Sequence, residues 1–230
     1  MRSARPLRYK RWMARPYEDA PRLPANRVEV FSLARGEWVE LEIGPGRGWF
    51  LIERAAAVPR AALVGLEIRR KWAAIVDGRL RARGLGDRAR VFAEDARDAL
   101  PRLAPDACLR RVFVHFPDPW WKKRHAKRLL ISDRFLDEVA RLLEPSGELF
   151  VQTDVEERAR SYEELVALDS RFIPAGTEAG SPRTSENPYE ARSPRERRAG
   201  IDGLPVHRLL WRRLPEPAAV DGLLHDESAR

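Results

Sequence analysis

The chain has 230 residues, of which 43% are hydrophobic and 34% charged, a composition typical of a globular protein with a heavily charged surface. No apolar run approaches the about 20 residues that a membrane helix needs, and no apolar segment follows the basic start at residues 1–5, so we expect neither a membrane span nor a secretory signal. The single cysteine, Cys108, cannot form an internal disulfide, which favours a buried thiol in a cytoplasmic protein.

The net charge is more informative than the composition about binding partners. It is +8 at neutral pH, an excess that attracts the phosphates of nucleic acids. An arginine-rich background is an alternative explanation, because arginine recurs along the whole chain. Lysine is scarce, however. The five lysines are Lys10, Lys71, Lys122, Lys123 and Lys127, and the last three fall within six residues. Charge alone therefore predicts an anionic partner, without choosing among RNA, DNA and other anions.

Secondary structure is expected to alternate regularly from Trp38 onward. Residues 1–35 are basic and interrupted by prolines, which predicts an N-terminal arm. Apolar runs and helical spacing then predict strands at 38–43, 61–67, 90–94, 111–116, 147–152 and 205–211. Helices are expected at 48–57, at 70–83, from the N-cap Ser132 to residue 143, and at 156–168. Residues 174–200 are rich in Gly, Pro, Ser and Arg and predict a long loop.

This alternation predicts an α/β fold, a doubly wound and mostly parallel sheet with helices on both faces. We expect one domain at residues 36–213, preceded by the arm at 1–35 and followed by a flexible tail at 214–230.

A glycine-rich turn follows the first expected strand. It reads Glu42-Ile-Gly44-Pro-Gly46-Arg-Gly48, and glycines there let the backbone approach a ligand at a helix N-terminus. Glu67 ends the second strand, where a carboxylate can accept both hydroxyls of a ribose. The pattern suits a dinucleotide or S-adenosylmethionine, and the acid two places before the first glycine favours the latter. A tight turn without a ligand is the alternative.

Asp95 follows the third strand, where the loop borders a nucleoside pocket in such folds. Its carboxylate can accept from an exocyclic amine, or it can cap a short helix at 96–100.

A proline-flanked acid and a basic cluster follow the fourth strand. Residues 114–128 read Val-His-Phe-Pro-Asp-Pro-Trp-Trp-Lys-Lys-Arg-His-Ala-Lys-Arg. Asp118 sits between two prolines, Trp120 and Trp121 offer stacking surfaces, and the cations can reach phosphate. A solvated charged face is the alternative, but it does not explain the acid at the ligand-binding edge of the sheet.

With these residues the chain resembles the bacterial tRNA (guanine-N7)-methyltransferase family. Phe116 to Arg128 is similar to that family's signature, and residues 41–48, 64–67 and 151–156 match in order, so the likeness spans roughly residues 38–212. The resemblance implies a Rossmann-like class I methyltransferase fold, S-adenosylmethionine as methyl donor and tRNA as substrate.

The resemblance also implies roles for individual residues. The donor is bound by the glycine turn and by the strand ends beside it: Glu42, Gly44, Gly46, Gly48, Glu67, Asp95 and Asp118. Asp118 is also the catalytic residue, and Lys122 and Asp154 contact the substrate. A Thr-x-x-Glu element that meets the target nucleoside corresponds to Ser193-Pro-Arg-Glu196, with Tyr189-Glu190 as a rival. Asp154 has an alternative as N-cap of the helix at 156.

Guanine N7 carries a free lone pair, so its methylation needs alignment and electrostatic support rather than a strong base. Asp118 would stabilise the cationic guanine, while Asp154 and Glu196 would read its N–H donors. His115 and His125 are expected at core or surface positions without a catalytic role. No cluster has metal-ligand spacing, so no metal is expected.

Two other functions remain open at this point: a nicotinamide-dependent oxidoreductase and a non-catalytic RNA-binding module. The first lacks a hydride-transfer site, and the second does not explain the glycine turn with Glu67. The sequence leaves the oligomeric state as monomer or homodimer.

Overall fold

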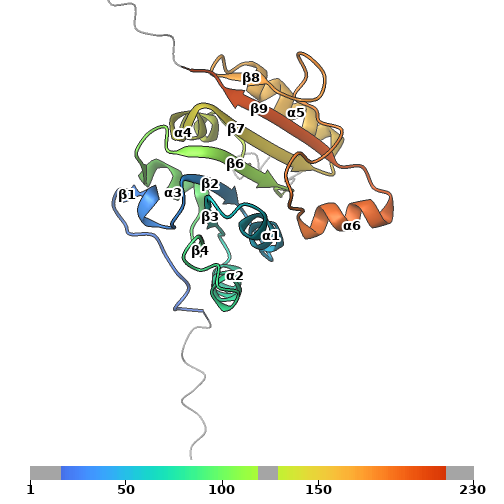
Figure 1. Cartoon of the computed structure of the whole chain (residues 1–230). Coiled ribbons are helices and arrows are strands. Elements are labelled where there is room, and N and C mark those ends of the chain that lie inside the picture. Colours follow the sequence, from blue (N-terminus) through green and yellow to red (C-terminus); the bar gives the residue numbers. More distant parts are fainter. Residues whose placement is uncertain (1–16, 119–128, 216–230) are drawn as a thin grey trace, which may run out of the picture.

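A seven-stranded sheet forms the centre of the computed structural model, which describes residues 17–118 and 129–215 (Figure 1). Its strands lie in the order β4-β3-β2-β6-β7-β9-β8. The first five are parallel, and β9 runs antiparallel to β7 and β8. The bounds are β2 Trp38–Ile43, β3 Ala61–Leu66, β4 Ala89–Phe92, β6 Leu109–His115, β7 Leu143–Thr153, β8 Phe172–Pro174 and β9 His207–Arg213.

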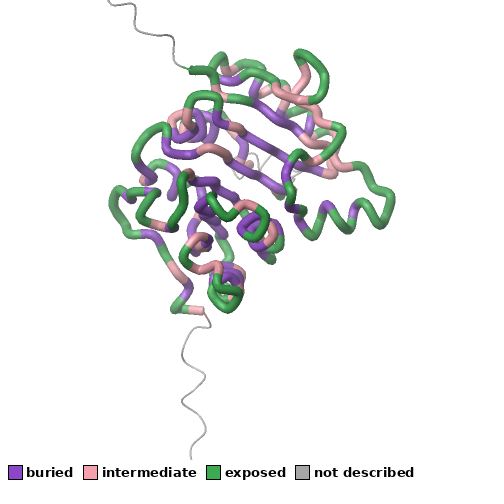
Figure 2. The backbone as a smooth tube through the Cα atoms, viewed as in Figure 1, coloured by how far each residue is buried: buried purple, intermediate pink, exposed green. Residues whose placement is uncertain are grey.

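Helices cover both faces, as the alternation predicts. On one face α1 (Trp49–Ala57) and α2 (Arg70–Ala82) pack their apolar sides on β3 and β4. On the other, α4 (Asp133–Leu142) and α5 (Glu156–Ala167) pack on the central strands, most of whose residues are buried (Figure 2). No helix in the described ranges is long and apolar enough to span a membrane. Cys108 is buried, and burial raises the pKa of its thiol to about 11.

The chain reverses its direction of travel across the sheet between β2 and β6. From β2 it moves outward through β3 to β4, and it then returns to place β6 on the other side of β2. Crossovers therefore leave β2 and β6 in opposite directions, which opens a crevice beyond their carboxyl ends. The loops that follow β2, β3, β4, β6 and β7 all meet at this edge.

Residues 17–35, expected as part of an arm, include core residues. The Leu23 N–H donates to Glu94 Oε1 at 3.1 Å, and the Ala93 N–H donates to the Pro21 carbonyl at 2.7 Å. A two-stranded parallel sheet adds β1 (Val28–Glu29) to β5 (Leu103–Ala104), with the short helices η1 (Val30–Ser32), η2 (Leu100–Arg102) and α3 (Ala96–Ala99) nearby. This segment thus braces the loop after β4.

The expected strands and helices of the domain are confirmed to within a few residues. The expected loop over 174–200 is confirmed for residues 175–193, which lie outside the helices and strands, but it is wrong for the rest of the segment. The segment contains α6 (Pro194–Asp202), which projects from the body of the molecule (Figure 1). Its start has Ser193 at the N-cap, a proline in the first turn and Glu196 at the third position, and it ends at Gly203 in the left-handed region. These are strong helix boundary residues in an otherwise loop-like composition.

Gly48 provides a test of the glycine turn. It has a φ of +74°, and a Cβ there would lie 2.1 Å from Val76 Cγ1. We expect Gly48→Ala to lower the free energy of unfolding by about 2–4 kcal/mol, because it adds left-handed strain and an overlap with a buried branched side chain. Gly78 lies on the exposed face of α2 with open space around it, so Gly78→Ala should instead raise the free energy of unfolding, by at most about 1 kcal/mol. Urea unfolding of both variants checks this, and equal effects would contradict it.

Candidate functional site

The turn after β2 leaves its backbone open to solvent-filled space at the sheet edge. Gly44 has a φ of +72°, and a Cβ built on it would meet nothing within 4 Å. The Gly48 N–H donates to the Pro45 carbonyl at 2.8 Å, which closes the turn before α1 begins. The turn therefore presents bare backbone at the N-terminus of a helix, an arrangement that suits a ligand in close contact.

Two cavities lie at this edge and share a wall. The first, which we call the β3 cavity, has a volume of about 650 Å³ and lies among the loops after β3 and β4. The second, the α6 cavity, has about 540 Å³ and lies between the glycine turn and the start of α6. Gly44 and residues 115–118 line both cavities. The two cavities therefore adjoin along these residues, so that ligands in them could meet there.

Glu67 lines the β3 cavity and is almost fully buried, while its contact with a ribose stays a prediction. Its Oε2 accepts from the Gly46 N–H at 2.9 Å, and its Oε1 accepts from the backbone N–H and the Nε of Arg69, each at 3.0 Å. The Arg69 side chain is 61% exposed, so this one contact can be exchanged for another donor while the two backbone contacts stay.

Asp95 is confirmed as the cap of a short helix, while its contact with a nucleoside amine stays a prediction. Its carboxylate accepts from the Arg97 N–H at 3.0 Å and caps α3, and it also lines the β3 cavity. The hydrogen bond from the Arg97 side chain holds the pKa of Asp95 below its usual range, so it carries a negative charge at neutral pH.

Glu42 forms a buried pair with His115, a residue for which no role was predicted. Glu42 Oε1 lies 2.9 Å from His115 Nδ1, and the two side chains are 2% and 3% exposed. Glu42 Oε2 and His115 Nε2 are also buried, and neither has a hydrogen-bond partner among the described residues. The only signal of His115 in the sequence is its place directly before the Phe-Pro-Asp-Pro motif.

The shared wall is made of strained and rigid backbone. Phe116 has a φ of +49°, and its N–H donates to the Gln152 carbonyl at 2.8 Å. Such strain in a non-glycine residue is typical of functional sites. It turns the chain sharply at the end of β6, so that exposed Asp118 lies at the boundary of both cavities. Lys122 and the rest of the basic cluster lie outside the described residues.

Asp154 lines the α6 cavity, and its alternative as a helix cap is wrong. The N-cap of α5 is Val155, whose side chain makes no capping bond. Asp154 instead pairs with Arg195 of α6, whose Nε lies 3.0 Å from Asp154 Oδ2. Arg195 is 61% exposed, so this partner also lies at the surface of the cavity.

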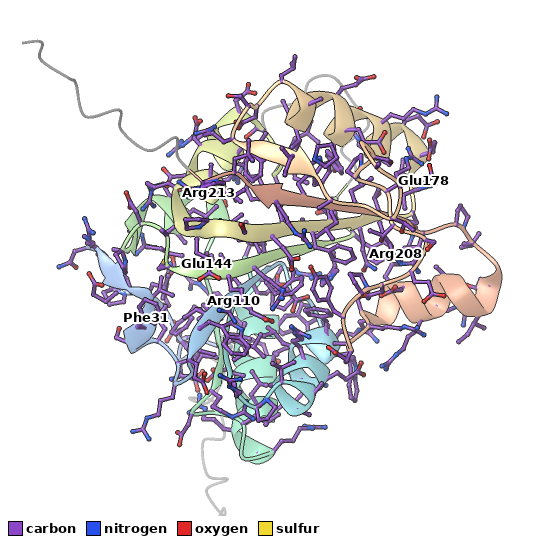
Figure 3. All side chains as sticks on the ribbon, turned by 45° about the horizontal axis from the view of Figure 1, so that its top comes forward. Phe31, Arg110, Glu144, Glu178, Arg208 and Arg213 are labelled. Atoms are coloured by element: carbon purple, nitrogen blue, oxygen red, sulfur yellow. The ribbon has the colours of Figure 1, made fainter. Side chains whose placement is uncertain are left out.

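Of the two candidates for the late substrate element, Ser193 lines the α6 cavity and Tyr189 does not. Ser193 Oγ accepts from the Glu196 N–H at 3.2 Å. The buried Glu196 carboxylate accepts from Asn187 Nδ2 at 2.9 Å and from Arg208 Nε at 3.1 Å. Arg208 lies on β9 (Figure 3). In this geometry Glu196 fixes the first turn of α6, and its contact with a substrate stays a prediction.

Tyr189 belongs to a buried ionic cluster below the site. Glu40 accepts from Arg54 Nε at 2.8 Å and from Arg111 Nη1 at 2.8 Å. Burial alone would raise the pKa of Glu40, but the hydrogen bonds from both arginines hold it below its usual range. Tyr189 packs against both guanidinium groups and donates to Glu148. The full cluster is Glu40, Arg54, Arg111, Glu148, Tyr189 and Glu190.

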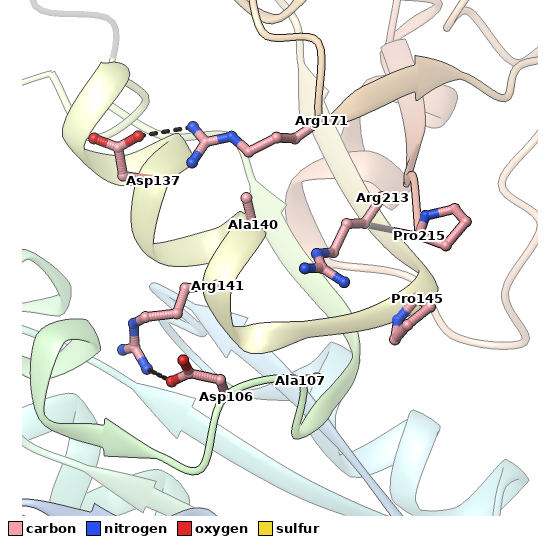
Figure 4. A pocket seen from close by; sticks show the side chains of 9 residues that line it. All are labelled: Asp106, Ala107, Asp137, Ala140, Arg141, Pro145, Arg171, Arg213 and Pro215. Carbon is pink, nitrogen blue, oxygen red and sulfur yellow. Dashed lines mark hydrogen bonds and ion pairs between the residues drawn. The ribbon is translucent and has the colours of Figure 1, made fainter. Parts of the chain in front are cut away.

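A third hollow, at the amino ends of the parallel strands, has a different character (Figure 4). Arg141 pairs there with Asp106 and Glu138, and Arg171 pairs with Asp137 and Asp169. With each of these cations matched by two carboxylates, and with none of the described site candidates among its lining residues, this hollow is no candidate for the site.

Comparison with known proteins shows the family of the chain. Residues 37–208 match the model of a family described as putative methyltransferase. A tRNA (guanine-N(7)-)-methyltransferase of Anaeromyxobacter dehalogenans is 44% identical over 197 residues, 84% of this chain and 94% of that protein. A protein of the same name from Paramagnetospirillum magneticum is 48% identical over 133 residues, 57% of this chain and 56% of that protein.

Solved structures show the fold. The 16S rRNA methyltransferase KamB superposes with a TM-score of 0.55 at 18% identity, over 79% of this chain and 90% of that chain. At this identity the likeness concerns the arrangement of strands and helices.

The buried cluster below the site should dominate stability. Arg54→Met leaves the Glu40 carboxylate buried with one partner fewer, and we expect it to lower the free energy of unfolding by about 3–5 kcal/mol. Arg60→Met is a matched control, because Arg60 pairs with Glu37 at the surface and should change the urea midpoint little. Equal midpoints for the two variants would show that the cluster does not bear on stability.

Proposed function

Because the chain belongs to the family of bacterial tRNA (guanine-N7)-methyltransferases, we propose that its two cavities bring S-adenosylmethionine and a guanine of tRNA together at Asp118. The protein is an S-adenosylmethionine-dependent methyltransferase with a Rossmann-like class I fold. The roles of individual residues are inferred from their contacts at the two cavities.

The observation that carries the proposal is the wall shared by the two cavities. A methyl transfer requires the acceptor, the methyl group and the sulfur in one line, with the two molecules held on opposite sides of a short gap. The β3 cavity holds two carboxylates suited to a nucleoside, and the α6 cavity holds Asp154 and Ser193. Asp118 stands where the cavities meet.

The residues present fit the methyl donor. Its positively charged sulfur supplies the methyl group. Glu42 Oε2 is a buried acceptor without a partner in the described ranges, which suits the cationic ammonium of the donor's aminoacid end. Glu42 lines the α6 cavity rather than the β3 cavity, so the aminoacid end would extend past Gly44 and His115, which line both. Glu67 would accept the ribose hydroxyls, with one of them replacing Arg69 Nε, and Asp95 would accept from the adenine amine. Gly44 leaves room for the chain between these two ends.

On the acceptor side, Asp154 can accept the N–H donors of the guanine Watson–Crick edge. Guanine would then take the place of Arg195, which is exposed and free to turn toward a phosphate. Ser193 offers a hydroxyl at the same cavity. Guanine N7 attacks with its own lone pair, so no residue has to remove a proton before the transfer.

Asp118 supports the transfer electrostatically. The guanine ring gains a positive charge as N7 takes the methyl group, and a fixed carboxylate nearby stabilises that charge more in the transition state than in the ground state. Proline precedes Asp118 and Phe116 is conformationally strained, so the carboxylate is held on rigid backbone.

The tRNA substrate accounts for the net charge of +8. A tRNA substrate favours the cytoplasm as compartment. Every residue of the proposed site belongs to one chain, so the chemistry works in a monomer or a homodimer.

Neither rival function fits as well. A nicotinamide-dependent oxidoreductase is at odds with the family, and a non-catalytic RNA-binding module would have no use for the buried acceptors in the β3 cavity. Calorimetry with S-adenosylmethionine and with NAD separates the three functions.

The reaction itself is tested with unmodified tRNA transcripts and donor labelled in the methyl group. After digestion we expect the label in 7-methylguanosine alone. Label in another nucleoside would overturn the choice of N7, and the absence of label from tRNA would overturn the tRNA substrate.

Glu67→Gln tests the nucleoside side. It keeps the shape of the side chain but loses the charge that strengthens hydrogen bonds to the ribose, so we expect S-adenosylhomocysteine to bind about tenfold to hundredfold more weakly. Calorimetry measures this, and Glu37→Gln, at the opposite edge of the sheet, is the control. An unchanged dissociation constant would remove Glu67 from the donor site.

Asp118→Asn tests the electrostatic role. The amide is nearly isosteric, so donor and tRNA should bind within a few-fold of the parent, while kcat should fall by a factor on the order of 10²–10³. Steady-state kinetics over donor concentrations up to saturation measures the effect. A parent-like kcat would contradict the role, and a rate restored by more donor would assign Asp118 to donor binding instead.

A further inference from the structure

The Glu42–His115 pair has an arrangement that a core packing role does not require. The pair lies where β2 and β6 end, and His115 lines both cavities. Two of its polar atoms, Glu42 Oε2 and His115 Nε2, are buried without a hydrogen-bond partner in the described part of the chain. Unsatisfied polar atoms at such depth are costly, and their presence beside a cavity points to a ligand that completes them.

The proton arrangement follows from the chemistry of the two groups. An ionised carboxylate only accepts hydrogen bonds, so the 2.9 Å contact requires the proton on His115 Nδ1. With a neutral imidazole the pair keeps one negative charge, carried by Glu42, and the bond from Nδ1 fixes the rotation of the carboxylate. Glu42 Oε1 thereby accepts the hydrogen bond from His115, and Glu42 Oε2 stays available to accept one from the ligand.

The imidazole is itself held firmly. Its ring centroid lies 4.2 Å from that of Phe50 on α1, 5.9 Å from Phe113 and 6.1 Å from Phe150. Aromatic rings from three elements thus surround His115 and leave it little freedom to turn. A donor fixed in this way can orient the Glu42 carboxylate without the loss of side-chain entropy that a mobile partner would incur.

We infer that His115 is a positioning residue that orients Glu42 as the receptor for the ammonium group of the methyl donor. The inference rests on the proposed function and adds a specificity to it. Through this pair the protein distinguishes nucleosides that carry an aminoacid chain from those that do not. Glu67 and Asp95, in contrast, hold the nucleoside part that both kinds of ligand share.

Two thioether nucleosides separate these contributions. S-adenosylhomocysteine carries the aminoacid chain, and methylthioadenosine lacks it. We expect His115→Phe, which keeps the ring packing but removes the donor, to weaken S-adenosylhomocysteine about tenfold to hundredfold while methylthioadenosine changes less than about threefold. His115→Asn, which keeps an N–H donor, should recover part of the loss. Calorimetry on the full chain measures the affinities of both ligands for each variant.

The control is Glu37→Gln, a change of an exposed carboxylate directly before β2 that lines neither cavity. It should leave both affinities unchanged. Equal losses for the two ligands in His115→Phe would mean a structural role and overturn the inference, as would unchanged binding of S-adenosylhomocysteine. If the parent protein bound neither ligand, the proposed function would fail and this inference with it.

Discussion

The buried carboxylate of Glu40 is the constraint on which the site depends. It has no exposure to solvent, so it is stable only because guanidinium groups from α1 and β6 meet it there. The same two arginines reach Glu148 on β7 and Glu190 in the segment before α6. One cluster of charges thereby fixes the relative positions of a helix, three strands and the chain that leads to the α6 cavity. Two residues further along β2, on the same face, Glu42 forms the floor of the site.

In the proposed site, which lies next to this cluster, the two cavities bind different molecules. Carboxylates at the ends of β3 and β4 serve the nucleoside of the donor, and the loop after β7 together with α6 serves the acceptor base. The strained turn at Phe116 brings the two together, because it sends the chain from β6 across the boundary between them. Arg69 and Arg195 cover carboxylates on either side, so ligands at these positions exchange with exposed side chains rather than with buried ones.

Strand ends explain why much of this could be predicted from the sequence. Apolar runs locate the strands, parallel strands end at one edge, and so Glu42, Glu67, Asp95 and Asp118 had to lie near one another. Other features depend on contacts far apart in the chain. No local sequence pattern shows that Arg195 faces Asp154 or that His115 contacts Glu42. Helix α6 was not predicted, because its arginines and proline give the segment a composition typical of a loop. The packing of residues 20–34 likewise depends on Glu94, about 70 residues away.

The central claim is that the methyl group passes directly between two ligands that meet beside residues 115–118, where the two cavities adjoin. A crystal structure with S-adenosylhomocysteine tests it most directly. We expect the adenosine in the β3 cavity with its ribose on Glu67, the aminoacid end on Glu42, and the sulfur facing Asp118 with the α6 cavity open beyond it. Adenosine bound in the α6 cavity, or a sulfur turned away from Asp118, would contradict the claim.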